Sequence, residues 1–373
     1  MNTFLRIVKN ETFSAYLLIP IALLAILLGS NFDSHFLEQS RQIANWHFNL
    51  REFTLDYLLG FFFYNIGLQL RFELSDGELK DRKVLGLSAL AAVLGMFVPA
   101  ITFYVFNRFN GTPTTGWGIT MATDLPFVLA ALVILKKNSL KGFVLALATI
   151  DDIGSVIVLS VLYKVHLHLL YLLGLVVILA LYFLISYLTQ SKLLLLSIFV
   201  VGLAIGHRAG IQTSLVAVLF GVITFKNRKK GLDLHERLLA VIEPFSALAV
   251  IPIFVFISLF RHFDFSTSAL GSTLVLSLVI VRLIGKPVGI FLGILIGKAA
   301  LRLKLPFSLA DALLIGALGT LGLDVSLIFA QRDFMGIAQN LAILGILVTI
   351  PVGIALALII HFLSPRDGRR INL

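Results

Sequence analysis

Two adjacent aspartates lie in the middle of an apolar stretch that is long enough to cross a membrane. Asp151 and Asp152 fall within residues 142–163, and no other charged residue occurs there. A charged side chain at the centre of a membrane helix costs at least about 2.5 to 3.5 kcal/mol on insertion scales. A cost of that size indicates that the pair is kept for a task other than folding, and the usual task of intramembrane carboxylates is to bind or pass cations or protons.

A third acid accompanies a break in another apolar segment. Asp124 stands in the sequence Thr123-Asp124-Leu125-Pro126. The proline has no amide hydrogen, and its ring clashes with the carbonyl four residues earlier, so the helix must be interrupted here. Non-helical backbone at bilayer depth is tolerated only where it is buried in protein or lines a watery cavity. We therefore expect Asp124 to face such a place.

Basic residues and a fourth acid occur in two later segments. Arg282 and Lys286 are four residues apart, which places them on one face of a helix. Residues 315–324 contain three glycines and end in Asp324, which predicts a second interruption. Interrupted segments in both halves of a chain are the best sequence indication of a transporter site, because half-helix ends offer partial charges to ions. Four acidic side chains against two basic ones leave an excess of negative charge, which exchangeable cations or protons could neutralise.

The composition predicts that these segments are membrane helices. Hydrophobic residues make up 58% of the 373 residues and charged residues 13%, with mean hydropathy +0.99, whereas soluble domains are about a quarter charged. We predict an all-α integral membrane protein with about twelve transmembrane helices, in one domain that covers residues 1–373. The expected segments are 13–30, 53–70, 84–106, 117–135, 142–163, 167–188, 192–206, 211–225, 238–260, 270–297, 308–330 and 337–362.

The distribution of the basic residues predicts the orientation. The net charge is +10. If both termini are cytoplasmic, the loops on that side carry about three times as many lysines and arginines as the opposite loops, as the positive-inside rule requires. The positive charge is thus explained by topology and by anionic lipid, and we expect no nucleic acid partner. Cysteine is absent, which excludes disulfides and thiolate metal sites.

Three motifs in this order resemble the NhaA family of sodium/proton antiporters. They are Ala122-Thr123-Asp124, the run from Ala148 to Gly154 around the aspartate pair, and Gly285-Lys286-Pro287-Val288-Gly289-Ile290. The resemblance implies an inverted-topology repeat, with halves near 84–163 and 270–362, whose two discontinuous helices cross near the bilayer midplane. It also implies exchange of sodium or lithium for protons, with no cofactor and no enzymatic activity. A multi-pass place in a bacterial inner membrane and a role in pH homeostasis would follow.

The resemblance also implies roles for single residues. Asp151 and Asp152 match the carboxylates that bind the cation or protons, and with Thr123 they are the expected sodium ligands. Asp124 matches the acid near the crossing of the two discontinuous helices and is a further expected ion- or proton-binding residue. Lys286 matches the lysine that pairs with the first carboxylate and is the expected charge partner or proton carrier. The cation and the protons would then compete for one site, and alternating access would convert competition into exchange.

The chain departs from the family pattern at four positions. Gln69 and Gln212 stand where the family often has a glutamate and a histidine, and glutamine cannot titrate, so pH regulation is left open. Arg282 and Asp324 stand where apolar or hydroxyl residues are expected. They would either form an additional buried pair or change the ion preference and stoichiometry, and we favour the pair because breaking buried ion pairs is costly. The sequence leaves open whether a homodimer forms.

Two other functions fit parts of the pattern. A sodium-coupled symporter of an organic solute could use a related fold, but it would need a roomier cavity and neutral oxygen ligands, whereas four buried acids favour proton coupling. An intramembrane aspartyl protease would share a proton between two aspartates. Gly322-Leu323-Asp324 lacks the second glycine of that family's signature, which argues against the protease.

Overall fold

The computed structural model describes residues 3–32, 41–43, 46–48, 50–163, 167–189, 191–225, 234–303, 305 and 307–363. Eight of the helices in these ranges are long and apolar enough to cross a membrane, and two shorter helices are also apolar. The predicted all-α membrane fold is confirmed. One short antiparallel β-hairpin, β1 (Arg41–Ile43) and β2 (Trp46–Phe48), was not predicted from the sequence.

The expected apolar segments all correspond to helices or to interrupted helices. In chain order these are α1 (Thr3–Asn31), α3 and α4 (Leu50–Phe53, Leu59–Ser75), α5 (Arg82–Phe109), a 3-10 turn with α6 (Trp117–Thr120, Leu125–Ile134), α7 (Lys141–Leu162), α8 (Leu169–Leu188), α9 (Lys192–Arg208), α10 (Thr213–Ile223), α11 and α12 (Leu234–Phe245, Ile251–Leu259), α14 (Thr273–Ala300), α15 and α16 (Leu309–Leu318, Asp324–Asp333) and α17 (Gly336–Leu363). The short helix α13 (Thr267–Leu270) precedes α14. The chain divides into two compact units, residues 1–80 with 152–263 and residues 81–151 with 264–373.

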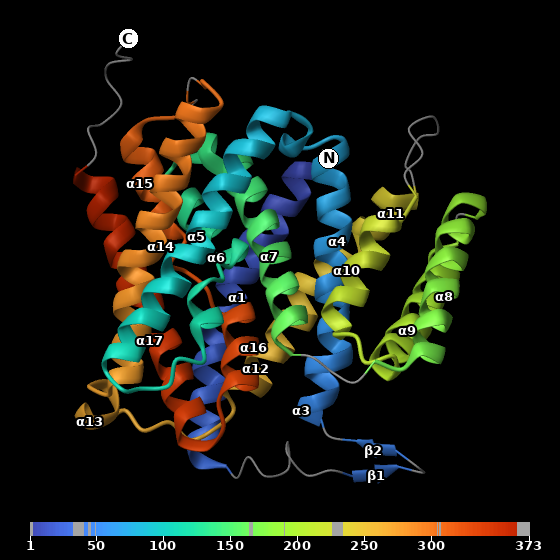
Figure 1. Cartoon of the computed structure of the whole chain (residues 1–373), viewed down its shortest axis with the longest axis horizontal. Coiled ribbons are helices and arrows are strands. Elements are labelled where there is room, and N and C mark those ends of the chain that lie inside the picture. Colours follow the sequence, from blue (N-terminus) through green and yellow to red (C-terminus); the bar gives the residue numbers. More distant parts are fainter. Residues whose placement is uncertain are drawn as a thin grey trace. The chain divides into compact units, whose positions relative to one another are not determined.

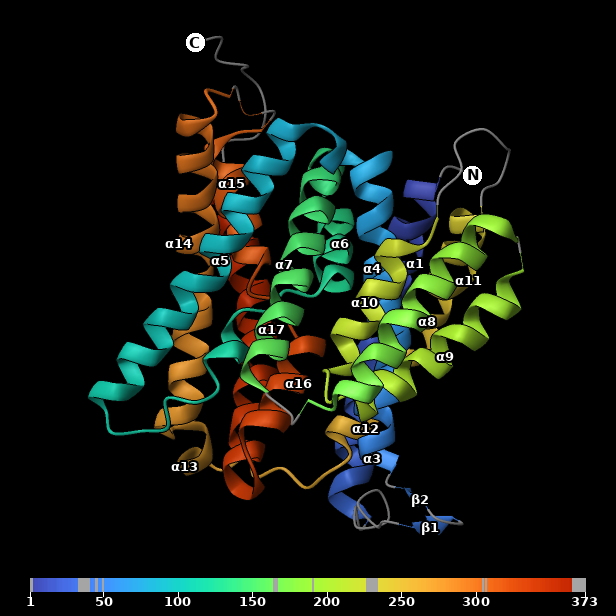
Figure 2. The same ribbon diagram turned by 45° about the vertical axis from the view of Figure 1, so that its right-hand side comes forward.

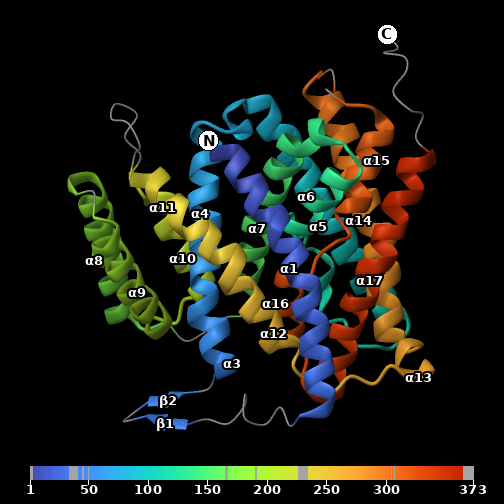
Figure 3. The ribbon, with the colours of Figure 1, turned by 180° about the vertical axis from the view of Figure 1, so that it is seen from behind.

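The first unit is held together by close helix crossings and by a chain of buried hydroxyls. Helix α1 packs beside α12 (Figure 3), and α8 and α9 lie side by side as a helical hairpin (Figure 1). Where α4 crosses α10, a Cβ added at Gly221 would lie 2.7 Å from the Cα of Gly67. The Tyr182 hydroxyl lies 2.6 Å from that of Tyr64 and 2.9 Å from that of Thr224, which links α8 to both crossing helices.

In the second unit, α14 and α5 lie side by side (Figure 2), and a row of glycines on α14, which we call the glycine seam, faces α5. Every fourth residue along one face of α14 is a glycine, and an added Cβ at each would come within 3.0 Å of α5. These four residues are Gly285, Gly289, Gly293 and Gly297. Small residues at this spacing let two membrane helices approach backbone to backbone, which gains dispersion contacts where lipid supplies no hydrophobic driving force.

Alanine at Gly289 is expected to loosen this seam. The new Cβ would overlap the carbonyl of Leu94, which is backbone and cannot rotate away. Overpacking of this kind costs typically about 1–3 kcal/mol, which should exceed the roughly 1 kcal/mol that alanine gains over glycine within a helix. The thermal unfolding midpoint of the purified chain should fall. Gly174→Ala is the matched control, because the nearest atom to its Cβ would be 3.8 Å away; equal midpoints for the two variants would contradict the prediction.

Both predicted interruptions occur, and both lie in the second unit. Residues 121–124 separate the 3-10 turn from α6, which begins with Pro126 in its first turn, and residues 319–323 separate α15 from α16. In the same unit, Lys137 forms a 2.8 Å ion pair with Asp311 in the first turn of α15. Residues 84–163 and residues 270–362 thus each contain one interrupted helix flanked by continuous ones, and their relation as an inverted repeat stays a prediction.

Candidate functional site

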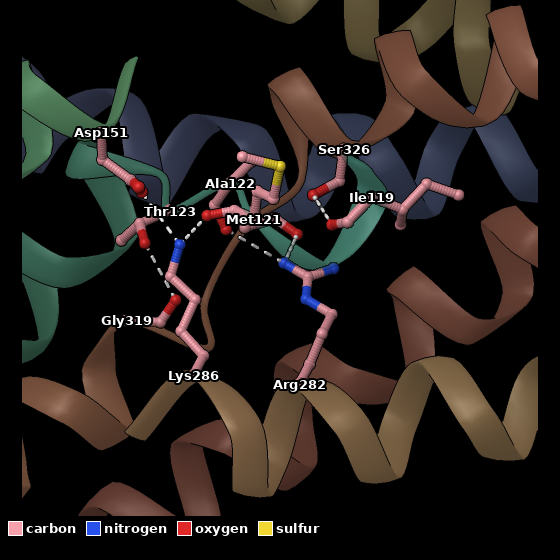
Figure 4. A network of polar contacts seen from close by, with 10 residues as sticks. Ile119, Met121, Ala122, Thr123, Asp151, Arg282, Lys286, Gly319 and Ser326 are labelled. Carbon is pink, nitrogen blue, oxygen red and sulfur yellow. Dashed lines mark hydrogen bonds and ion pairs between the residues drawn. The ribbon is translucent and has the colours of Figure 1, made fainter. Parts of the chain in front are cut away.

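The two interrupted helices contact each other at and beside their non-helical residues 121–124 and 319–323, and we call this contact the crossing. The amide of Asp124 donates to the carbonyl of Leu321 at 2.7 Å. The Thr123 hydroxyl donates to the carbonyl of Gly319 at 3.0 Å, and the Ser326 hydroxyl donates to that of Ile119 at 3.1 Å (Figure 4). These bonds satisfy polar backbone groups that would otherwise be unpaired at bilayer depth.

The carboxylate of Asp124 binds the free amides at the start of α16 and offsets their partial positive charge. Its Oδ2 accepts hydrogen bonds from the backbone amides of Leu323 and Asp324, at 2.5 and 2.9 Å. Asp124 is only 4% exposed. The first amides of a helix have no intrahelical partner and carry the positive end of the helix dipole, so a carboxylate placed here neutralises charge as well as filling hydrogen-bond capacity.

A buried ion pair joins α14 to α7. The Lys286 ammonium lies 2.9 Å from Oδ2 of Asp151, and both side chains are fully buried. Lys286 also donates to the carbonyl of Met121, at the end of the 3-10 turn. The lysine thus contacts both a candidate ion-binding carboxylate and the crossing itself. Removing one partner of such a pair leaves an uncompensated buried charge.

Arg282 lies one turn before Lys286 on α14 and reaches the same crossing. Its Nη2 donates to the carbonyl of Gly322 at 2.7 Å and to that of Ala122 at 3.5 Å. The side chain is completely buried, and its Nε and Nη1 have no hydrogen-bond partner within the described ranges. The hydrogen bonds of Arg282 in this structure go to backbone carbonyls, and an ion pair with Asp324 stays a prediction.

The structure brings most of the candidate residues together in the second unit. Thr123, Asp124, Asp151, Lys286 and Arg282 surround the crossing, and Asp324 begins α16 there. Asp152 follows Asp151 on α7 and is partly exposed. Successive helical residues differ by about 100° in direction, so the two carboxylates do not point the same way.

Two departures from the family pattern lie in the first unit. Gln69 is buried within α4, and Gln212 precedes the first residue of α10.

Backbone carbonyls are the functional groups that side-chain reasoning missed. The two cations on α14 donate to the carbonyls of Met121, Ala122 and Gly322. The signal that could have found them is the pair of helix breaks, because each break frees carbonyls that need donors. In the part of the chain that the structure describes, no group of three or more His, Asp or Glu side chains could hold a metal ion. A sodium site here would therefore rely on hydroxyl and carbonyl oxygens in addition to carboxylates.

Comparison with known proteins gives a match over nearly the whole chain. The family described as Na+/H+ antiporter 1 matches residues 5–361. Similar proteins include the Na(+)/H(+) antiporter NhaA 1 of Clostridium beijerinckii, 31% identical over 97% of this chain and 96% of the relative. The Na(+)/H(+) antiporter NhaA 2 of Aliarcobacter butzleri is 30% identical over 88% of each chain. The NhaA protein of Aliivibrio fischeri is 29% identical over 91% of this chain and 92% of the relative.

A solved structure shares the fold at low sequence identity. The sodium proton antiporter MjNhaP1 from Methanocaldococcus jannaschii aligns with a TM-score of 0.59 at 16% identity, over 97% of this chain and 99% of that one. That likeness supports the helical membrane architecture alone. The family match and the relatives above carry the assignment, and they show that the chain belongs to the NhaA family of sodium/proton antiporters.

Proposed function

We propose that the chain exchanges sodium or lithium for protons across a bacterial inner membrane by alternating access. The observation that carries this function is the buried ion pair between Lys286 and Asp151, beside the crossing of the two interrupted helices. A carboxylate kept at this depth with a single ammonium partner can exchange that partner for a metal cation or a proton. The repeat halves near 84–163 and 270–362 would supply the moving parts of one transporter domain.

The cation would bind between the two aspartates and the hydroxyl of Thr123. Thr123 lies beside Asp151 (Figure 4), and its hydroxyl hydrogen is used in the bond to Gly319. The lone pairs of that oxygen therefore remain available to a cation. Alkali cations are hard ions and take oxygen ligands, as calcium and magnesium do. Asp152, on the next position of α7, would supply the second carboxylate and bind either the cation or a proton.

Asp124 has a different task in this scheme. Its carboxylate is occupied by two backbone amides, so we propose that it keeps the crossing assembled rather than travelling through the transport cycle as a ligand. Each cycle that expels sodium would bring protons into the cytoplasm, the reverse cycle would take up sodium and remove protons, and the gradients present would set the direction. That exchange would serve sodium tolerance and pH homeostasis.

Everted membrane vesicles that contain the protein test this function. After respiration has formed an interior-acid pH gradient, addition of sodium or lithium is expected to dissipate it, as read by the recovery of fluorescence of a pH-gradient dye. Vesicles that lack the protein are the control, and potassium is added separately to measure selectivity. A gradient insensitive to all three cations at every pH tested would overturn the proposal. A sodium-coupled symporter would give that result unless its organic solute were present.

A further inference from the structure

Arg282 and Lys286 of α14 contact different chemical groups at the crossing, although they lie on one face of the helix. Lys286 pairs with the carboxylate of Asp151 and donates to the carbonyl of Met121. The hydrogen bonds of Arg282 go to one carbonyl of each interrupted segment, Ala122 and Gly322 (Figure 4). The arginine therefore bridges the linkers of the two segments.

These carbonyls lie in the non-helical linkers of the two interrupted helices. Ala122 lies between the 3-10 turn that ends at Thr120 and the start of α6, and Gly322 lies between α15, which ends at Leu318, and the start of α16. A buried carbonyl outside a helix or strand needs a hydrogen-bond donor from elsewhere in the protein. Asp124 accepts from the amides at the start of α16. Without Arg282, Lys286 alone of these two cations would remain for both the linker carbonyls and Asp151.

The site has room for the side chain of Arg282. A Cβ at Gly322 would overlap both the carbonyl of Ala122 and the Nη2 of Arg282, so the absence of a side chain at 322 makes room for the contact. A guanidinium stays charged at every accessible pH, and its Nη2 can donate to two acceptors. Its acidic neighbours include Asp124 and Asp151. A permanent, fully buried cation therefore lies between two linker carbonyls and two carboxylates.

We propose that Arg282 is a positioning residue that holds the non-helical linkers of both interrupted helices together. Because Arg282 binds these carbonyls, Lys286 can pair with Asp151. The lysine can then give up this pairing when a cation binds to Asp151, while the crossing stays assembled. The proposal deepens the proposed antiport and rests on it for the meaning of Lys286. The role assigned to Arg282 within the crossing stands on the geometry alone.

Three full-length variants in reconstituted membranes test the proposal. Arg282→Met removes the charge at similar length, Arg282→Lys restores a charge, and Lys286→Met removes the neighbouring charge. Amide hydrogen exchange in residues 119–124 and 319–324 is followed together with the maximal rate and the KM of sodium-driven proton movement. Arg282→Met is expected to speed exchange in both segments by roughly tenfold or more, because hydrogen bonds from a charged group are lost. Its maximal rate should fall by a similar factor, with a smaller change in KM.

The other two variants separate the effect of the charge from that of its position. Arg282→Lys should recover most of the protection and of the rate. Lys286→Met should impair transport and leave the exchange of residues 319–324 near that of the parent, although residues 119–124 lose the bond to Met121 in this variant. The proposal is overturned if Arg282→Met protects both segments as the parent does, or if Lys286→Met exposes residues 319–324 as much as Arg282→Met does. It is also overturned if Arg282→Lys is as impaired as Arg282→Met, including the case in which neither folds. Folding of the lysine variant alone would support it.

Failure of the proposed function gives a distinct result. If the parent protein moves no protons on addition of sodium, antiport is refuted, and the hydrogen exchange of the three variants still decides the role of Arg282. If the parent transports normally and Arg282→Met leaves exchange and rate unchanged, antiport stands and the positioning role is refuted.

Discussion

Asp152→Asn and Asp151→Asn are each expected to abolish the sodium-dependent loss of a pH gradient in everted vesicles. Asparagine keeps the shape of the side chain but can neither carry the negative charge that a cation needs nor hold the exchanged proton. We expect the initial rate to fall by roughly a hundredfold or more, which corresponds to about 3 kcal/mol. Asp76→Asn, an exposed aspartate after α4, is the matched control and should transport as the parent does.

The two variants should differ in stability although both lose transport. Asp151→Asn leaves the ammonium of Lys286 buried without its carboxylate, and breaking a buried pair in this way costs about 3–5 kcal/mol. Asp152 is partly exposed, so its replacement should leave the thermal unfolding midpoint nearly unchanged. Adding Lys286→Met to Asp151→Asn should restore much of the midpoint and none of the transport. Sodium-dependent transport by either single variant at a rate near that of the parent would contradict the proposed site.

Asp124→Ala is expected to cause the largest loss of stability among single substitutions at the crossing. The amides of Leu323 and Asp324 would lose a buried acceptor that carries a charge. Each such hydrogen bond contributes about 1.5–3 kcal/mol, so the free energy of unfolding should fall by roughly 3–6 kcal/mol. The measurement is the thermal unfolding midpoint of the purified chain in detergent.

Asparagine at the same position provides the graded comparison. Asp124→Asn keeps one carbonyl oxygen that can accept, but it removes the charge at the amide end of α16, so its midpoint should lie between those of the parent and of Asp124→Ala. Asp76→Ala controls for loss of an exposed aspartate. An unchanged midpoint for Asp124→Ala would show that the two amides are satisfied in another way, and it would remove Asp124 from the description of the crossing.

The helix breaks could be predicted from the sequence because their causes are local. Pro126 cannot continue a helix from the preceding turn, and the glycines before Asp324 weaken one. The partners across the crossing could not be predicted by such reasoning, since the residues that meet are separated by as many as 207 positions. The ion pair of Lys286 with Asp151 was expected only through the resemblance to the family.

Backbone groups account for the remaining differences. The pair of Arg282 with Asp324 stays a prediction. The hydrogen bonds from the guanidinium to the carbonyls of Ala122 and Gly322 were not predicted, because a count of charged side chains contains no carbonyls. The glycine seam of α14 is visible in the sequence as a four-residue repeat, but a repeat does not say which helix it meets. The β-hairpin is too short to show a reliable alternation of side chains.

The long sequence separation across the crossing has a consequence for synthesis of the chain. Asp124 precedes the amides of Leu323 and Asp324 by 199 and 200 residues. At about 5–20 residues per second, the ribosome needs roughly 10 to 40 s to produce those amides. Throughout that interval a carboxylate destined for bilayer depth lacks its partners. We therefore expect the start of α6 to stay in contact with water or with the insertion machinery during that interval, and its entry into lipid to be completed when α15 and α16 arrive.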